Sequence, residues 1–213
     1  MFQQHPSEKL NDSFKLRPYQ GVDPFAATFL FIGLDANYDS EIENSTSFFN
    51  ILNYHYDSLA FWRLHGVHHP FLLPEYRGDG RRYHKTFASI GFTSKHADLV
   101  SFIEMLHVPT VGRNKLTPSD LDIKHLKRIN FAILYGNAKH IFISAGVASL
   151  MYASGVFPWL PKVAKGGDTL RIFYEDNFRT VYLHLHFSNY GKFQQQLNFE
   201  ISAINTLLLT NNR

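Results

Sequence analysis

The sequence predicts an α/β fold, a three-layer α/β/α sandwich with a short, mainly parallel central sheet. Short apolar runs indicate buried strands, and stretches with a helical period of apolar residues lie between them. The first run, residues 29–32, ends at Gly33 and leads into a polar loop that carries Asp35. In open sheets, ligands bind beyond the carboxyl ends of the strands, so Asp35 would lie at such an edge. Asp is also common in ordinary turns.

The composition is that of a globular domain. The chain has 213 residues, of which 45% are hydrophobic and 18% are charged, enough for one domain with a full core. No apolar run reaches the roughly 18 residues that span a bilayer, and residues 1–12 are too polar for a signal peptide. The absence of cysteine excludes disulfides, thiolate catalysis and Cys-ligated metals. We therefore expect a cytoplasmic monomer without membrane association.

The charge balance is mildly basic. The net charge is +3 and the sequence pI is near 9.0, which permits a polyanionic partner without requiring one. Aromatic residues form 15% of the chain; they fill cores first, and stacking on bases is their rarer use. The chain lacks G-x-G-x-x-G and G-x-x-x-x-G-K-[ST] motifs, which argues against those modes of nucleotide-phosphate binding. We expect no cofactor.

The order of the elements is predicted from capping and turn residues and from the spacing of apolar residues. Residues 1–24 are polar and proline-containing and are expected to form an arm, and residues 25–213 a single domain. Pro118 and Asp120 after Thr117 predict a helix start, and Gly136 its end. The other expected elements are helices over 47–65, 146–154 and 193–208, and strands over 87–93, 140–144, 170–174 and 180–185; prolines keep 67–74 irregular.

A second polar loop follows the last expected strand. His186 and Ser188 leave that strand together, and a helix comes next. In a parallel sheet this loop would open on the same edge as Asp35, so we expect Asp35 and His186 to share one cleft.

Both loops resemble the signature loops of the uracil-DNA glycosylase superfamily. Residues 33–38 (GLDANY) resemble its water-activating loop, which reads Gly-x-Asp/Asn-Pro in many members, and residues 186–190 (HFSNY) resemble its His-Pro-Ser loop. Residues 91–95 and 109–114 are similar to segments of the mismatch-specific branch. The resemblance covers most of the chain after the arm and depends on the order and spacing of short motifs.

The chain departs from the family pattern in three places. Ala36 and Phe187 stand where the family usually has proline. The asparagine that reads uracil in the best-known branch has no clear counterpart, and Thr93 or Ser94 occupies the expected position. These departures support a rival hypothesis, a nucleic-acid-binding protein that has kept the fold and lost the chemistry.

The resemblance implies cleavage of the N-glycosidic bond between a damaged base and deoxyribose. Asp35 would then be the carboxylate that stabilises positive charge on the sugar and orients water, and His186 the donor to the leaving base. A turn Asp and a strand-end His bonded to backbone are the structural alternatives. Substrate contacts would come from Gly33, Leu34, Ala36, Asn37, Tyr38, Phe48, Phe49, Thr93 and Ser94.

The remaining polar candidates concern DNA and metals. The resemblance places Ser188, with Asn189, Tyr190 and Lys192, near the DNA backbone and minor groove; a plain turn is the alternative. Arg81 and Arg82 belong to a basic stretch that either contacts phosphate or is a solvated loop. One of Phe48 and Phe49 is expected in the core. Histidines 65, 68 and 69 lack a nearby acidic partner, so we expect no metal site.

The sequence therefore predicts a monofunctional DNA glycosylase that acts on uracil or a related deaminated base with water as nucleophile. Neither signature loop contains a lysine, so no Schiff-base step is expected; Lys192 lies just beyond the second loop. The alternatives are the non-catalytic nucleic-acid-binding protein and a hydrolase of a small nucleoside-like molecule.

Overall fold

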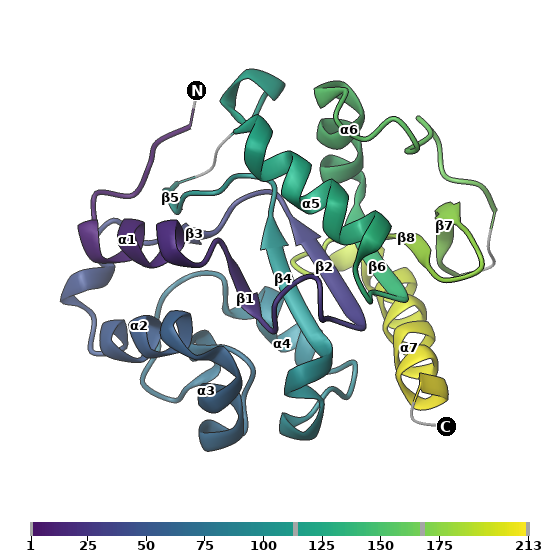
Figure 1. The fold of residues 1–213 in the computed structure, drawn as a ribbon. Coiled ribbons are helices and arrows are strands. Elements are labelled where there is room, and N and C mark those ends of the chain that lie inside the picture. The colour runs from purple at the N-terminus through teal and green to yellow at the C-terminus, as the bar shows by residue number, and fades with distance from the viewer. Residues whose placement is uncertain (1, 113–114, 167–168, 212–213) are drawn as a thin grey trace.

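A six-stranded mixed sheet forms the centre of the computed structural model, which describes residues 2–112, 115–166 and 169–211 (Figure 1). The strand order is β1-β4-β2-β6-β8-β7. The inner strands run parallel: β4 (Val100–Glu104), β2 (Phe29–Gly33), β6 (His140–Ser144) and β8 (Thr180–His184). The edge strands β1 (Tyr19–Gly21) and β7 (Arg171–Glu175) are antiparallel to their neighbours. The expected α/β class and mainly parallel sheet are confirmed.

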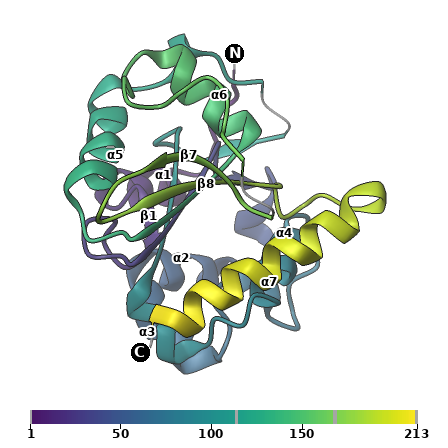
Figure 2. The same ribbon diagram turned by 90° about the vertical axis from the view of Figure 1, so that its right-hand side faces the viewer.

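Alternation along the strands gives the sheet two different faces. Leu30 and Ile32 belong to an aliphatic cluster, which is covered by α5 (Ile123–Tyr135) and α6 (Ala145–Ser154). Phe29 and Phe31 belong to an aromatic cluster, which is covered by α3 (Ser58–His65), α4 (Arg81–Ala88) and α7 (Gln194–Asn211). Figure 2 shows α5 and α6 on one side of the strands and α7 on the other. Because both faces are covered, the central residues of the inner strands are mostly apolar, and polar residues such as Glu104 and His184 lie mainly at the strand ends.

A smaller unit lies beside the main sheet. It contains α1 (Glu8–Leu16), α2 (Phe48–Tyr56) and a parallel pair of two-residue strands, β3 (Asn37–Tyr38) and β5 (Thr110–Val111). A third apolar cluster joins these helices to β3. The 3-10 turns are η1 (Ile42–Asn44), η2 (Pro70–Leu72), η3 (Ser94–Leu99), η4 (Pro118–Asp120) and η5 (Gly191–Phe193). None of the described helices is both long and apolar enough to cross a membrane.

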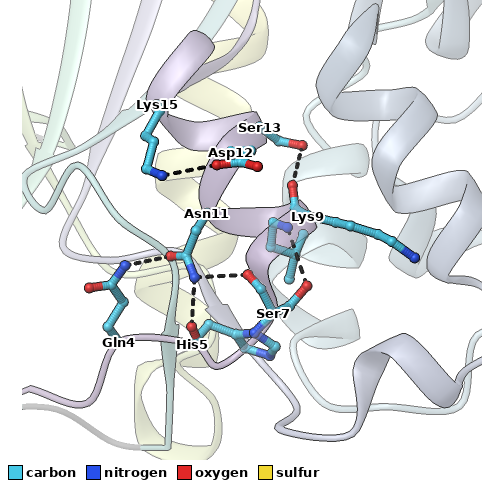
Figure 3. A network of polar contacts seen from close by, with 9 residues as sticks. Gln4, His5, Ser7, Lys9, Asn11, Asp12, Ser13 and Lys15 are labelled. Atoms are coloured by element: carbon cyan, nitrogen blue, oxygen red, sulfur yellow. Dashed lines mark hydrogen bonds and ion pairs between the residues drawn. The ribbon is translucent and has the colours of Figure 1, made fainter.

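The segment 1–24, expected as an arm, contributes a helix and a strand to the fold. Ser7 caps α1 by accepting a hydrogen bond from Leu10 N at 3.2 Å. Asn11 ties the preceding chain to this helix, since its Nδ2 donates to the carbonyls of His5 and Ser7 at 2.8 Å each (Figure 3). After α1, β1 pairs with β4. Local polar contacts thus fix a segment that composition alone does not distinguish from a tail.

Three expected elements differ from the structure. The expected helix 47–65 is two helices, because Asp57 ends α2 and its side chain caps α3 by accepting from Ala60 N at 2.9 Å. The expected strand 87–93 is wrong: Phe87 ends α4 and a turn follows, with Gly91 at φ +102°. One of the two neighbours of β2 is β4, a strand that the sequence patterns did not predict. Thr117 opens η4, and α5 itself begins after Asp122.

Candidate functional site

The carboxyl ends of the four parallel strands meet at one edge of the sheet. Gly33 of β2 lies opposite Glu104 of β4, and Ser144 of β6 lies opposite His184 of β8. Asp35 and His186 each follow two residues after their strands, on either side of β6. Their charges are close enough that Asp35 affects the pKa of His186. The expectation that both residues lie at the same edge agrees with this geometry.

Asp35 is held in place by the chain that follows β4. The buried Thr110 Oγ1 donates a hydrogen bond to Asp35 Oδ2 at 2.6 Å. Backbone bonds from Met105 N to Gly33 O and from Thr110 N to Ala36 O run alongside. The carboxylate therefore projects from a pair of bonded segments, and its position is fixed before any ligand arrives.

Glu104 is a functional candidate that sequence reasoning missed. Its carboxyl lies directly over Gly33: a Cβ added at that glycine would come 1.9 Å from Glu104 Oε2. Burial raises the pKa of Glu104 to about 8, and the charge of Asp35 adds to the effect. At neutral pH this carboxyl is mostly protonated. Two carboxyl groups, one of them with a raised pKa, thus share the edge, as is typical of acid–base sites.

His186 presents a hydrogen-bond donor at the same edge. The backbone N–H of Ser188 donates to His186 Nδ1 at 3.3 Å, so in the neutral ring Nε2 carries the proton. Although the residue is exposed, surrounding protein atoms lower the pKa of His186, and the charge of Asp35 opposes that shift. A neutral ring with a free Nε2–H suits a donor to a developing negative charge.

Tyr83 of α4 connects the two sides of the site. Its ring lies 5.2 Å from the His186 ring and 5.3 Å from the Phe187 ring. Burial, with the nearby charge of Glu104, raises the pKa of Tyr83 well above its ordinary value. Its hydroxyl therefore stays protonated, and its ring packs near the rings of His186 and Phe187.

The other residues of the first loop divide between core and surface. Ala36 and Tyr38 are buried in the third apolar cluster, where Tyr38 Oη and His55 Nε2 share a hydrogen bond of 2.8 Å. Leu34 packs against the aliphatic cluster. Asn37 is exposed, and its Nδ2 donates to Thr110 Oγ1 at 3.3 Å. These contacts make most of the loop a support for Asp35 and leave few side chains for a ligand.

The expected base-contacting residues are distributed unevenly. Phe48 is buried in the core and Phe49 is 71% exposed, which agrees with the expectation that one of the two is structural. Thr93 and Ser94 precede β4, so they lie toward the amino end of that strand, away from Asp35. The assignment to Thr93 or Ser94 depended on the wrong strand; Glu104 is the residue at the carboxyl end of the strand beside β2.

An exposed basic and aromatic group lies beside His186. The guanidinium of Arg82 stacks over the Tyr190 ring at 4.6 Å, which joins α4 to the loop after β8. Lys192 and Tyr190 are exposed, and Ser188 and Asn189 are partly exposed. Arg81 instead bonds the Tyr76 carbonyl at 3.0 Å, a structural role. Arg113 and Asn114, which end the 109–114 segment, lie outside the described residues.

Two histidines of the chain after α3 and one histidine of α4 form a largely buried stack. His68 Nε2 lies 3.1 Å from His84 Nδ1, and the His69 and His84 rings stack at 3.6 Å between centroids. Burial lowers the pKa of all three histidines. His65 is exposed. Within residues 2–112, 115–166 and 169–211, no three His, Cys, Asp or Glu side chains are arranged to hold a metal.

Neither the protein-family models nor the curated protein sequences compared with this chain gave a match. The fold and the site define an α/β protein whose candidate ligand-binding edge carries a fixed carboxylate, a second carboxyl and a histidine donor.

Proposed function

We propose that this chain is a monofunctional DNA glycosylase with a uracil-DNA glycosylase-like three-layer fold, which hydrolyses the N-glycosidic bond of uracil or a related deaminated base. One observation carries the proposal. A carboxylate fixed by Thr110 and a histidine with a free Nε2–H stand at the same edge of the sheet, on either side of β6. The reaction needs those two groups, one for the sugar and one for the base.

The reaction divides charge between the two groups. The base first leaves the helical stack. As the C1′–N bond breaks, its electron pair goes to the base, and His186 Nε2–H donates a hydrogen bond to the base carbonyl. Asp35 stabilises the positive charge on the sugar and orients the water whose oxygen bonds to C1′. The water proton passes to solvent or to the released base, so the products are free base and an abasic site.

Phe187 compensates for the proline that is missing from the His186 loop. It is fully buried and its ring lies 4.7 Å from that of His184 and 6.1 Å from that of Phe31. A proline restricts a loop through its ring, and a buried aromatic anchor restricts it through packing. The His186 loop is therefore constrained by a different device, which supports a working site.

Arg82, Tyr190 and Lys192 support nucleic acid as the substrate carrier. They form an exposed basic and aromatic group next to His186. Such a group binds phosphates and stacks on bases without reading their sequence. A hydrolase of small nucleosides would have no use for it.

The test is a panel of oligonucleotides, single- and double-stranded, that contain uracil, hypoxanthine, xanthine or mispaired thymine, together with the corresponding free deoxynucleosides. At enzyme excess, base release is measured by alkaline cleavage of abasic sites in the oligonucleotides and by chromatography of the free base for the deoxynucleosides, and DNA binding is measured by anisotropy. Release from at least one substrate is expected. Binding without release from any of them would favour the non-catalytic binder, and release only from free nucleosides would favour the small-molecule hydrolase.

A further inference from the structure

The Glu104 carboxyl lies at the candidate site, and no described residue forms a hydrogen bond or ion pair with it. It lies over Gly33, where every side chain larger than hydrogen would collide with Oε2 or Cδ. His125 Nε2 bonds the backbone carbonyl of Glu104 at 2.8 Å and leaves its carboxyl free. Among the described residues, that carboxyl has no hydrogen-bond donor and no ion-pair partner. The residue is only partly buried, so its carboxyl is open to a hydrogen bond from water or from a ligand.

Burial, and to a smaller extent the charge of Asp35, favours the neutral form of Glu104, and four groups interact electrostatically with this carboxyl. They are Asp35 beyond β2, Tyr38 of β3, Tyr54 of α2 and Tyr83 of α4. None of them is a cation, and Asp35 adds negative charge. Burial raises the pKa of Glu104 to about 8, and it also raises the pKa of the three tyrosines above the usual range. Between pH 7 and pH 9, Glu104 is therefore the group in this set that changes charge.

A neutral carboxyl and an ionised one offer different hydrogen bonds. The neutral form has an O–H donor beside a C=O acceptor, whereas the ionised form only accepts. Deamination converts an amino-substituted base into one with a ring N–H beside a C=O. That edge accepts from the O–H and donates to the C=O of one neutral carboxyl.

We propose that Glu104 is the residue that reads the base, through a paired hydrogen bond between its neutral carboxyl and the adjoining N–H and C=O of a uracil- or hypoxanthine-like ring. This inference rests on the proposed function, in which Asp35 and His186 contact sugar and base at the same edge. Glu104 adds a third contact, from the strand on the other side of β2. Loss of its proton removes the donor and leaves an acceptor oxygen opposite the base carbonyl.

The test measures binding separately from base release. One oligonucleotide carries 2′-fluoro-2′-deoxyuridine, which resists hydrolysis, and the other carries a tetrahydrofuran abasic analogue at the same position. The ratio of their affinities isolates the contribution of the base. It is measured from pH 6.5 to pH 9 for the wild type, Glu104→Gln and Glu104→Leu. Glu175→Gln, the same change at the end of β7, is the matched control.

The expected ratio is roughly tenfold or more for the wild type at pH 6.5, since one paired contact to a base edge discriminates to that extent. It should fall toward one above pH 8. Glu104→Gln keeps a donor beside an acceptor and cannot ionise, so its ratio should stay high at every pH. For Glu104→Leu the ratio should be close to one at every pH, and for Glu175→Gln it should match that of the wild type.

The failures are distinguishable. A base-dependent ratio with the expected pH profile, but no release of any base, would overturn the proposed function and support the reading role. Base release with the same ratio and pH profile in wild type, Glu104→Gln and Glu104→Leu would overturn the reading role alone. No base-dependent ratio in the wild type would also overturn it. Circular dichroism tests whether each variant keeps the fold. If Glu104→Leu does not fold, the pH profile of Glu104→Gln alone decides the question.

Discussion

The two sides of the carboxyl edge are built differently. On the acidic side, Asp35 is fixed by Thr110 and by backbone bonds along the chain after β4, and Glu104 fits over Gly33. On the histidine side, His186 is exposed and its ring is held by one backbone N–H. Asp35 is therefore the more firmly held of the two groups, whereas the exposed ring of His186 has fewer polar contacts although Phe187 anchors its loop in the core. Preorganised charge acts without reorganisation during the reaction.

The largest expected effect comes from removing the charge on the acidic side. Asp35→Asn should reduce single-turnover base release by about 10²-fold or more, because one preorganised contact is worth roughly 3 kcal/mol in a transition state. DNA affinity should stay the same or rise, since a negative charge near phosphates is lost. Asp98→Asn, the same change on η3, should alter neither. Equal rates for Asp35→Asn and wild type would remove the catalytic role.

Gly33→Ala should break the fit between β2 and Glu104. An added methyl would lie 1.9 Å from Glu104 Oε2, the end of a flexible side chain that can turn aside, so we expect the free energy of unfolding to fall by about 1 kcal/mol, the lower end of overpacking costs. Gly166→Ala is the control, because nothing lies within 4 Å of that position. Urea denaturation measures both. If the collision is the cause, Glu104→Ala in the same chain should restore most of the loss; additive losses would refute it.

The buried histidines should make the fold acid-sensitive. Burial lowers the pKa of His55 to about 3, whereas in the unfolded chain it is near 6.5. As pH falls below 6.5, the unfolded state takes up a proton that folded His55 does not. Stability that is complete above that pH then falls by about 1.4 kcal/mol per pH unit for this residue.

A pair of variants isolates that contribution. His55→Gln keeps an acceptor for Tyr38 Oη. Between pH 6 and pH 5 it should reduce the slope of unfolding free energy against pH by about 1.4 kcal/mol per pH unit, which corresponds to one proton. His65→Gln changes an exposed histidine and should leave the slope as it is. If the slopes of His55→Gln and the wild type coincided, buried His55 would not be a source of the acid sensitivity.

The smallest expected effect concerns the bond that fixes Asp35. Thr110→Val keeps the shape and removes the 2.6 Å hydrogen bond to Oδ2. We expect about tenfold slower base release and a stability loss of about 1 kcal/mol. Ser89→Ala, which removes an exposed hydroxyl bonded to a backbone carbonyl, is the control for release. Unchanged release in Thr110→Val would show that the carboxylate is positioned by other contacts.

The sequence predicted those elements whose local pattern of apolar and capping residues also fits their tertiary environment. The strands at β2 and β6 are uninterrupted apolar runs, and both are buried. Gly136 ends α5 as expected. The break at Asp57 was missed because apolar spacing continues across it, and only the cap contact separates the two helices.

The site was predictable in part. Asp35 and His186 follow strands directly, so topology brings them to one edge. Glu104 was missed because a polar residue at a strand end is ordinary. Its position in the site depends on its pairing with Gly33, which is far away in the sequence. The run before it, Val100 to Ile103, was the available signal. The histidine stack depends on α4 packing against the chain after α3, which no local pattern shows.

The most direct test of the central claim is mass spectrometry of a uracil-containing oligonucleotide after incubation with excess enzyme. The account predicts an intact strand in which the base has been replaced by a hydroxyl, no covalent adduct after borohydride treatment, and far less product with Asp35→Asn than with Asp98→Asn. An oligonucleotide that keeps its uracil, in single- and double-stranded form alike, would contradict it.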